Sequence, residues 1–299
     1  MEDDRDIEAM ESTIAAPHPA PHRPGAFTPP PGACDAHCHL FGPAARFPFA
    51  ADRTYTPPDA GLEQFVELHA RLGLSRAVFV QASCHGTDNS AMVDALIRGA
   101  GRYAGVAMID GSADERLIGD LHDAGVRGAR FNFVAHLGGA PSMEEFWSVV
   151  QRITPFGWHL VLHFDAVDLP GATNLLDRLT IPFVIDHMAR VDAAAGLDQA
   201  PFAVLCELLD DERAWVKISG AERLSAAGPP SYADVVPYAR ALIAAAPQRI
   251  LWGTDWPHPN VRQMPDDGDL VDLLAAFAPN EVDRNMILVD NPARLYDFA

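Results

Sequence analysis

The sequence is poor in basic residues and in cysteine, and each scarcity excludes a class of function. Lys and Arg total 22 against 41 Asp and Glu, which gives the 299-residue chain a formal net charge of −19. A chain of this charge repels phosphate groups, so we expect no nucleic-acid partner and no binding to an acidic membrane surface. The four cysteines are too few and too scattered for a disulfide framework, so we expect them to be reduced.

The sequence also lacks long apolar segments. No stretch approaches the roughly 18 consecutive apolar residues of a membrane span. The acidic start, MEDDRDIEAMES, lacks the basic and apolar regions of a secretory signal. Hydrophobic residues nevertheless make up 48% of the chain, which is enough for a large core. These features indicate a cytoplasmic globular protein.

Proline is unevenly distributed along the chain. Residues 1–32 contain seven of the 25 prolines. Because proline removes a backbone donor and interrupts helices, we predict a flexible or polyproline-like leader over residues 1–32. The composition of residues 33–299 is uniform, so we predict a single catalytic domain there.

Short segments rich in Val, Ile, Leu and Phe alternate with stretches of amphipathic pattern along this domain. The short segments are typical of parallel strands buried on both faces. The spacing of apolar residues predicts helices over Leu62–Leu72 and Ala91–Gly101, and Ser90 and Ser142 occupy positions expected of helix N-caps. The predicted strands are Cys34–His37, Arg76–Ala82, Tyr103–Ile109, Val126–Phe133, Trp158–Phe164, Pro182–Asp186, Ala214–Ile218 and Arg249–Gly253.

Eight strands that each precede a helical segment predict an α/β fold, namely a closed (β/α)₈ TIM barrel. A doubly wound open sheet is the alternative. The nucleotide-binding motifs GxGxxG and GxxxxGK[ST] that would support it are absent from the sequence.

Polar side chains follow most of the predicted strands at the point where each strand ends. Because the carboxyl ends of barrel strands surround one active site, we expect these side chains to gather at one mouth. His37 and His39 are two residues apart and so face the same side of a strand. In this arrangement both imidazoles can bind one metal ion or contact one oxygen atom. Asp255 follows a buried strand, where a carboxylate is costly unless it is paired or functional. The residues at strand ends are His37, His39, Ser83, Cys84, His85, Arg130, Asn132, His163, Asp165, Asp186, His187, Lys217, Ser219, Asp255, His258 and Asn260.

Some of the polar residues fit a structural role better. His69, His122 and His159 lie within helical segments or at a strand start, and we interpret them as structural. Lys217 has two readings: it either binds an anionic substrate with the arginines or pairs with a buried acid. A nucleophilic serine is not favoured because no GxSxG motif is present.

Five motifs occur in order between Cys34 and Tyr296: DAHCHLFGP, FVQASCHGTDN, GARFNF, VIDHMAR and ILWGTDWPHPN. Together they resemble the amidohydrolase superfamily, and within it the lactonase branch that hydrolyses 2-pyrone-4,6-dicarboxylate. The resemblance implies a (β/α)₈ barrel of the amidohydrolase type. It also implies hydrolysis of a cyclic ester that bears carboxylates, without a required cofactor.

The resemblance assigns roles to individual residues. Asp255 matches the general base that activates water, and the residues that polarise the lactone carbonyl are matched by His37, His39 and His187. The positions that contact substrate in the family are occupied here by Tyr55, Ser83, Arg130, His163, Arg223 and His258.

The chain departs from the family at two positions. His136 replaces a second arginine, and His163 replaces a tyrosine at the end of the fifth strand. His163 is also where metal-dependent amidohydrolases place a ligand, and zinc suits nitrogen ligands with one carboxylate. We expect His163 to donate a hydrogen bond to a substrate carboxylate, with a zinc site as the alternative. The candidate ligands of that site are His37, His39, His163, His187 and Asp255.

The sequence therefore predicts a lactone hydrolase that opens an anionic intermediate of aromatic-compound breakdown. The expected substrate is 2-pyrone-4,6-dicarboxylate or a related muconolactone or sulfomuconolactone. One alternative is a zinc-dependent decarboxylase of an aromatic acid that uses the same His and Asp residues. Another is a barrel that binds an anionic metabolite without turnover, which Asp255 disfavours because a bare carboxylate weakens anion binding. The expected partner in each case is a small anionic molecule.

Overall fold

The computed structural model describes residues 14–298, so the first 13 residues of the predicted leader lie outside the described residues. Eight strands form one sheet in the order β1 to β8, and each strand is parallel to the next. The strands are β1 (Cys34–Cys38), β2 (Arg76–Val80), β3 (Tyr103–Ala107), β4 (Val126–Asn132), β5 (His159–His163), β6 (Phe183–Ile185), β7 (Ala214–Lys217) and β8 (Ile250–Leu251).

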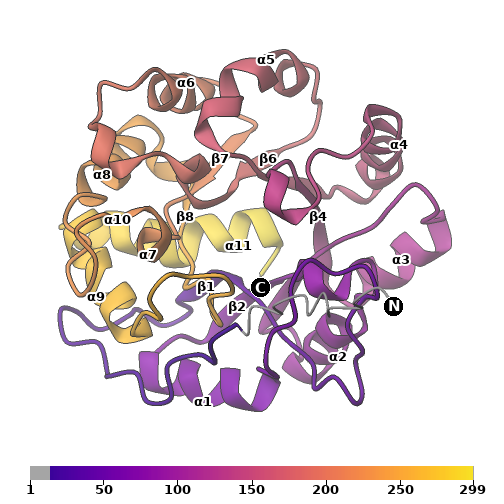
Figure 1. Cartoon of the computed structure of the whole chain (residues 1–299), viewed down its shortest axis with the longest axis horizontal. Helices are drawn as coiled ribbons and strands as arrows, with labels where there is room; N and C mark the ends of the chain where they lie inside the picture. The colour runs from indigo at the N-terminus through magenta and orange to yellow at the C-terminus, as the bar shows by residue number, and fades with distance from the viewer. Residues whose placement is uncertain (1–13, 299) are drawn as a thin grey trace, which may run out of the picture.

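The sheet curls until its first strand meets the segment that follows β8. The backbone N–H of Ala36 donates to the carbonyl of Trp252 at 2.8 Å, and the N–H of His39 donates to Trp256 at 2.7 Å. In the opposite direction, the N–H of Asp255 donates to the carbonyl of His37 at 2.8 Å. These bonds make a nearly closed barrel with helices around it (Figure 1), which confirms the predicted (β/α)₈ fold.

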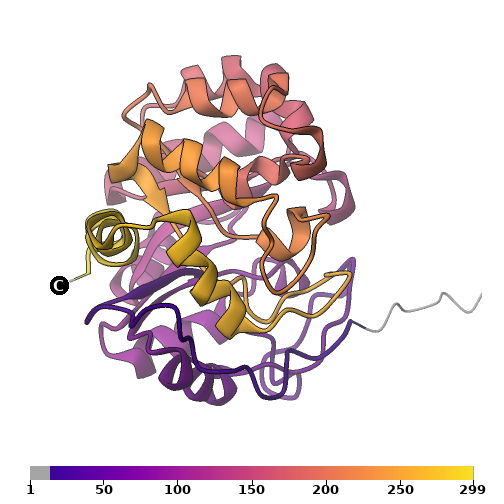
Figure 2. The same cartoon turned by 90° about the vertical axis from the view of Figure 1, so that its left-hand side faces the viewer.

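Helices cover the outside of the barrel (Figures 1 and 2). Leu62–Leu72 forms a helix with the predicted bounds, and Ser142 caps α4 by accepting a hydrogen bond from the N–H of Glu145. Ser90 is the first residue of α2 and not its cap, because Asn89 occupies the cap position. The helices are α1 (Leu62–Leu72), α2 (Ser90–Gly99), α3 (Glu115–Asp123), α4 (Met143–Ile153), α5 (Leu169–Asp177), α6 (Ala200–Leu208), α7 (Ala221–Leu224), α8 (Val236–Ala245), α9 (Asp267–Phe277), α10 (Glu281–Asn285) and α11 (Asn291–Tyr296).

All eight predicted strands are present, but most end earlier than predicted. β2 ends at Val80 and β3 ends at Ala107, although the apolar pattern continues to Ala82 and Ile109. Ala82 and Ile109 are buried in the core without pairing to a neighbouring strand. Apolar character reports burial and not backbone pairing, so the pattern extends the strands into the loops that line the barrel mouth.

An apolar cluster fills part of the barrel interior, and α11 covers the amino ends of the strands. Val161 lies between His159 and His163 on the inward face of β5 and packs in a cluster with Val78. Tyr296 of α11 belongs to the same cluster and packs against His159, the first residue of β5, with ring centroids 5.0 Å apart. Since α11 covers the amino ends of the strands, only the carboxyl ends are open to form a site (Figures 1 and 2).

The described part of the predicted leader is attached to α9. The N–H of His22 donates to Asp266 at 3.1 Å, and the N–H groups of Gly25 and Ala26 donate to Asp272 at 2.8 and 2.7 Å. Residues 22–26 therefore lie against the barrel and do not extend from it. No helix among residues 14–298 is long and apolar enough to cross a membrane.

Candidate active site

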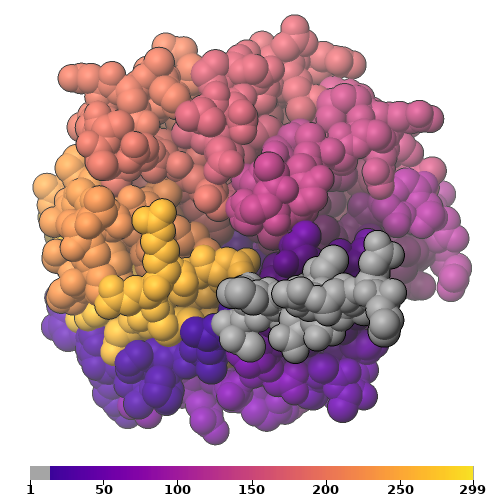
Figure 3. Space-filling view, viewed as in Figure 1, coloured from indigo at the N-terminus to yellow at the C-terminus, as the bar shows by residue number. Residues whose placement is uncertain are grey.

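A cavity of about 240 Å³ opens at the carboxyl ends of the strands. Figure 3 views this face of the molecule and shows it hollowed near the centre. The lining comes from seven of the eight strands, either from the carboxyl half of the strand itself or from the segment that follows it, as expected for a barrel active site. The lining residues are His39, Tyr55, Ser83, Arg130, His136, Leu137, His163, His187, Arg190, Glu222, Arg223, Asp255, Pro259, Asn260, Val261 and Arg262.

Most of the residues predicted from the sequence line this cavity, but two do not. His37 is fully buried, with its Nε2 3.6 Å from Asp255 Oδ1, so it lies behind Asp255. His258 is also fully buried, and its Nε2 is hydrogen-bonded to Asp267 Oδ1 at 2.9 Å. Its other ring nitrogen, Nδ1, lies 4.0 Å from Oε1 of the cavity-lining Glu222, so His258 sits one residue back from the cavity and its contact with substrate stays a prediction. The predicted residues that do line it are Asp255, His39, His187, Tyr55, Ser83, Arg130, His163 and Arg223.

Asp255 lies at the centre of the site and is held as a carboxylate. Arg223 Nε donates to Asp255 Oδ2 at 2.6 Å, and His39 Nε2 donates to Oδ1 at 3.1 Å. Burial alone would raise the pKa of Asp255, but Arg223 and the neighbouring histidine His187 outweigh it and hold the pKa well below its usual range. The backbone at Asp255 has a φ of 65°, a left-handed conformation that costs roughly 1–3 kcal/mol and occurs mainly at functional sites.

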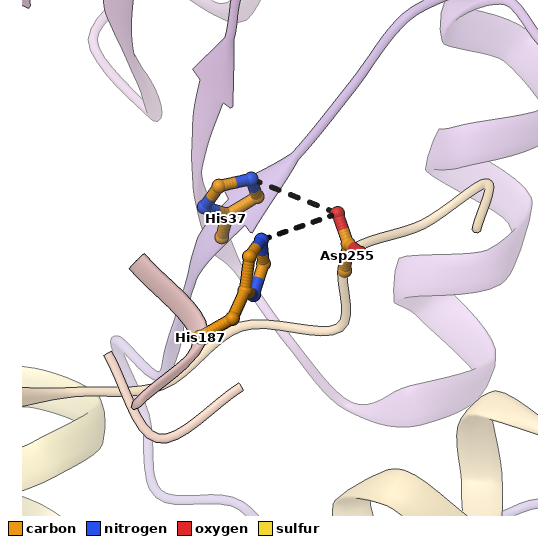
Figure 4. Close-up of side chains that lie close together, drawn as sticks. All are labelled: His37, His187 and Asp255. Atoms are coloured by element: carbon orange, nitrogen blue, oxygen red, sulfur yellow. Dashed lines mark ion pairs between the residues drawn. The ribbon is translucent and has the colours of Figure 1, made fainter. Parts of the chain in front are cut away.

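Three imidazoles surround one oxygen of this carboxylate. The Nε2 atom of His39 lies 3.1 Å from Asp255 Oδ1. The Nε2 atoms of His37 and His187 lie 3.6 and 3.9 Å from the same oxygen (Figure 4). The Nδ1 of His39 also contacts the carbonyl of Val80 at 2.8 Å. A carbonyl and a carboxylate only accept hydrogen bonds, so a proton on either ring nitrogen of His39 has an acceptor in this arrangement.

His187 is positioned by an unusual backbone. The four residues from His187 to Arg190 all have positive φ, between 50° and 54°. The Nδ1 of His187 lies 2.9 Å from Ser219 Oγ. The next residue, Gly220, has a φ of 83°, and a Cβ there would lie 3.0 Å from the Cβ of His187, tight enough to press on this side chain. Burial lowers the pKa of His187 to about 4, so its imidazole is neutral at neutral pH.

Below the cavity floor, Lys217 is fully buried with Asp186 and His37. Lys217 Nζ lies 3.1 Å from Asp186 Oδ1 and 3.0 Å from His37 Nδ1. Of the two readings of Lys217, the structure supports pairing with an acid, since Lys217 does not line the cavity. Burial and then Lys217 hold the pKa of His37 well below its usual range, so this ring is neutral too.

Four arginines line the cavity although the chain is strongly acidic. Arg130 is fixed by donating to the carbonyl of Gln81 at 3.2 Å, and Arg190 is paired with Asp165 at 2.8 Å. Arg262 is exposed at the rim of the cavity. Guanidinium groups bind carboxylate and sulfonate groups through paired hydrogen bonds, so the cavity suits an anion.

Both histidines that depart from the family line this cavity. His163 Nδ1 lies 3.5 Å from a guanidinium nitrogen of Arg130, which can only donate, so the proton of neutral His163 is on Nε2. His163 Nε2 is buried and has no hydrogen-bond partner among the described residues. Burial, reinforced by Arg130, holds the pKa of His163 well below its usual range. His163 thus presents a free N–H donor, with His136 beside it at a ring-centroid distance of 6.3 Å.

Sequence reasoning missed three charged residues of the cavity: Glu222, Arg190 and Arg262. Both carboxylate oxygens of Glu222 lack a hydrogen bond among the described residues, and burial raises its pKa. Arg190 follows His187 in the motif VIDHMAR, so its place at a strand end could have identified it. Glu222 and Arg262 lie several residues beyond their strands, where no pattern shows which way the loop turns.

The positions of three residues fit a divalent metal ion. Ligand atoms of His37, His187 and Asp255 lie within 4.8 Å of one another, the one such group in the described part of the chain (Figure 4). Two imidazole nitrogens and a carboxylate oxygen suit zinc. His37 Nε2 has no hydrogen-bond partner among the described residues. Of the other two predicted ligands, His39 is bonded to Asp255 and His163 lies outside this group.

Comparisons with known proteins give one family. The family model described as amidohydrolase matches residues 34–298. A 2-pyrone-4,6-dicarboxylate hydrolase from Comamonas testosteroni is 47% identical over 279 residues, which cover 90% of this chain and 92% of that protein. A 4-sulfomuconolactone hydrolase from Rhizobium radiobacter is 44% identical over 277 residues, with coverage of 91% and 92%. The solved structure of a candidate 2-pyrone-4,6-dicarboxylic acid hydrolase from Pseudomonas putida is 32% identical with a TM-score of 0.79, and the match covers 89% of this chain and 98% of that one.

Proposed function

The chain belongs to the amidohydrolase family, and we propose that it is a lactone hydrolase that opens an anionic cyclic ester during aromatic-compound breakdown. Membership confirms the resemblance seen in the sequence motifs. The relatives at 47% and 44% identity are hydrolases of 2-pyrone-4,6-dicarboxylate and of 4-sulfomuconolactone. We propose one of these two lactones, or a close analogue, as the substrate.

The observation that carries the proposal is the ionised Asp255 inside a ring of donors. Arg223 keeps this carboxylate deprotonated, so it can accept a proton from water at neutral pH. The oxygen of that water attacks the lactone carbonyl, and His39 and His187 line the cavity where the oxyanion develops. When the ring C–O bond breaks, the ring oxygen takes the proton that Asp255 removed from water.

The arginines and His163 bind the acidic groups of the substrate in this proposal. Arg130 and His163 lie together inside the cavity, and Arg262 lies at the rim. In this proposal Arg130 and His163 bind one acidic group of the substrate and Arg262 binds a second. The free Nε2–H of His163 takes the place of the hydroxyl that the family's tyrosine supplies, which keeps a neutral donor at this position.

If a divalent ion binds, His37, His187 and Asp255 would hold it. It would supply Lewis-acid polarisation of the carbonyl and a lower pKa for bound water. The predicted alternative of a zinc-dependent decarboxylase has no specific support, because the relatives with the highest identity named above are hydrolases. We also propose a cytoplasmic location, which the four free cysteines support.

The test is a panel of lactones followed by the loss of ultraviolet absorbance of the conjugated ring. The panel contains 2-pyrone-4,6-dicarboxylate, 4-sulfomuconolactone and an uncharged pyrone. We expect turnover of at least one anionic lactone and a decrease of about 10²- to 10⁴-fold in kcat for Asp255→Asn. Asp120→Asn, an exposed change on α3, is the matched control. Lack of turnover of every anionic lactone, or full activity of folded Asp255→Asn, would refute the proposal.

A further inference from the structure

Lys217 is a buried cation that the proposed reaction does not use. Its side chain is fully buried in the barrel, with Nζ 3.0 Å from His37 Nδ1 and 3.1 Å from Asp186 Oδ1. Burying a charged amine is costly, and pairing with Asp186 offsets this cost. Pairing with Asp186 does not explain the second contact, in which Nζ is in hydrogen-bonding geometry with His37 Nδ1.

The contact with Lys217 determines where His37 carries its proton. A lysine ammonium has three N–H donors and no acceptor, so His37 Nδ1 must accept. The proton of the neutral imidazole is then on Nε2. The competing arrangement has Nδ1–H donating to Asp186 Oδ1, which lies 3.2 Å away. That contact lacks hydrogen-bond geometry, since both oxygens of Asp186 are without a hydrogen bond among the described residues.

The position of this proton matters because His37 Nε2 faces the catalytic carboxylate. Nε2 lies 3.6 Å from Asp255 Oδ1 and has no other partner in the described part of the chain. With a proton on Nε2, the positive end of the N–H dipole faces the carboxylate oxygen at 3.6 Å and stabilises its charge electrostatically, without a hydrogen bond. With a lone pair on Nε2, two electron-rich atoms face each other, and a cation between them becomes favourable. In the second case His37, His187 and Asp255 form a metal site.

We propose that Lys217 is a positioning residue that holds the proton of His37 on Nε2, so that the polar N–H of His37 faces Asp255 and the ring is withheld from a metal ion. The proposal builds on lactone hydrolysis as the proposed function, but its main measurement needs no substrate. Removal of Lys217 leaves His37 Nδ1 free to donate to Asp186, which exposes the Nε2 lone pair. A carboxylate that accepts from the distal nitrogen of a histidine also strengthens its metal binding.

The direct test is nitrogen NMR of metal-free protein labelled with ¹⁵N at histidine. The signal of His37 is assigned by its loss in His37→Gln. We expect a protonated Nε2 and an unprotonated Nδ1 at neutral pH. The reverse tautomer in the unaltered chain would overturn the proposal, even if Lys217 variants do not fold. Because no turnover is measured, this result is independent of whether any lactone is hydrolysed.

The second test compares Lys217→Met with Lys217→Arg. Each protein is exposed to zinc, separated from unbound metal and analysed for zinc content and for the His37 tautomer. We expect Lys217→Met to gain about 10- to 100-fold in zinc affinity, the usual size of the effect of an outer partner of a ligand. Lys217→Arg keeps a charged donor at this position, so it should retain the tautomer and gain no zinc. An unchanged zinc affinity and unchanged tautomer in folded Lys217→Met would overturn the proposal.

Discussion

Replacement of Arg223 by Met tests how the base is kept ionised. Arg223 Nε lies 2.6 Å from Asp255 Oδ2, and Asp255 is buried. The variant therefore removes the arginine partner of a buried carboxylate. Removing one partner of a buried ion pair costs about 3–5 kcal/mol. His39 remains bonded to the other oxygen at 3.1 Å, so we expect the lower end, near 3 kcal/mol, in urea unfolding at neutral pH.

The same replacement predicts a change in pH dependence whose sign follows from the pKa of Asp255. In the folded protein this pKa lies below its unfolded value, so the stabilisation is fully present at neutral pH and is lost as the pH falls through the folded pKa. Without Arg223 the folded pKa rises, and the protonated variant no longer buries an unpaired charge. The stability deficit of Arg223→Met should therefore shrink in acid. The acid limb of kcat/KM should move to higher pH.

The control for this prediction is Arg116→Met, an exposed arginine on α3 whose partner is Asp120. We expect it to leave both the stability and the pH profile nearly unchanged. Arg223→Lys retains the charge without the fork-shaped donor, so its acid limb should move less than that of Arg223→Met. A stability deficit that is the same at every pH, together with an unmoved acid limb, would refute the reasoning. Arg223 would then serve substrate binding alone.

Three further predictions concern the cavity and its support. Arg130→Met and Arg262→Met should each raise KM for doubly charged lactones more than for an uncharged pyrone, by an amount worth about 1.5–3 kcal/mol for each lost charged hydrogen bond; equal losses on both substrates would contradict this. His163→Ala should weaken the use of anionic lactones and His163→Tyr should restore much of it, because both histidine and tyrosine supply a neutral donor; failure of tyrosine to rescue would argue against a donor role. Gly220→Ala should lower stability by about 1–2 kcal/mol in urea unfolding and reduce kcat by displacing His187, since Gly220 has a φ of 83°. Gly171→Ala, in a helix with open space around the new methyl group, is its control and should not destabilise the protein.

The barrel could be predicted because each strand is recognisable from its own short stretch of sequence. Buried parallel strands need continuous runs of apolar residues, and polar residues such as His163 and Asp255 stand out directly after them. The site follows from topology, since eight such ends must meet at one mouth. The likeness to the amidohydrolases then added roles that no strand pattern contains. Tyr55 in a loop and Arg223 in the short helix α7 in particular are identified only by the family motifs.

What could not be predicted depends on side-chain direction. Lys217 and His258 both occupy positions typical of site residues. Lys217, however, contacts His37 beneath the cavity, and His258 is hydrogen-bonded to Asp267 at the start of α9. The backbone decides this, as at His258, where a φ of 61° turns the ring to Asp267. Glu222 is a buried carboxyl that an observer of the sequence would place in solvent on α7. Its carboxylate lies 3.3 Å from Arg223 Nε and 4.0 Å from Nδ1 of His258, a residue 36 positions later in the chain, and a linear pattern does not encode that contact.

The attachment of residues 22–26 to α9 has a consequence for anyone who engineers the start of this chain. Asp266 caps α9 and accepts from the N–H of His22, and the next residue, Asp267, holds His258 beneath the loop that carries Asp255. A protein trimmed to begin at residue 33 would match the catalytic domain predicted from composition. It would, however, lose the hydrogen bonds that residues 22–26 make to Asp266 and Asp272, and so weaken the start of α9, which supports the loop that carries Asp255. Expression tags and truncations should therefore be placed before residue 22. Trimming beyond it should cost thermal stability and turnover together.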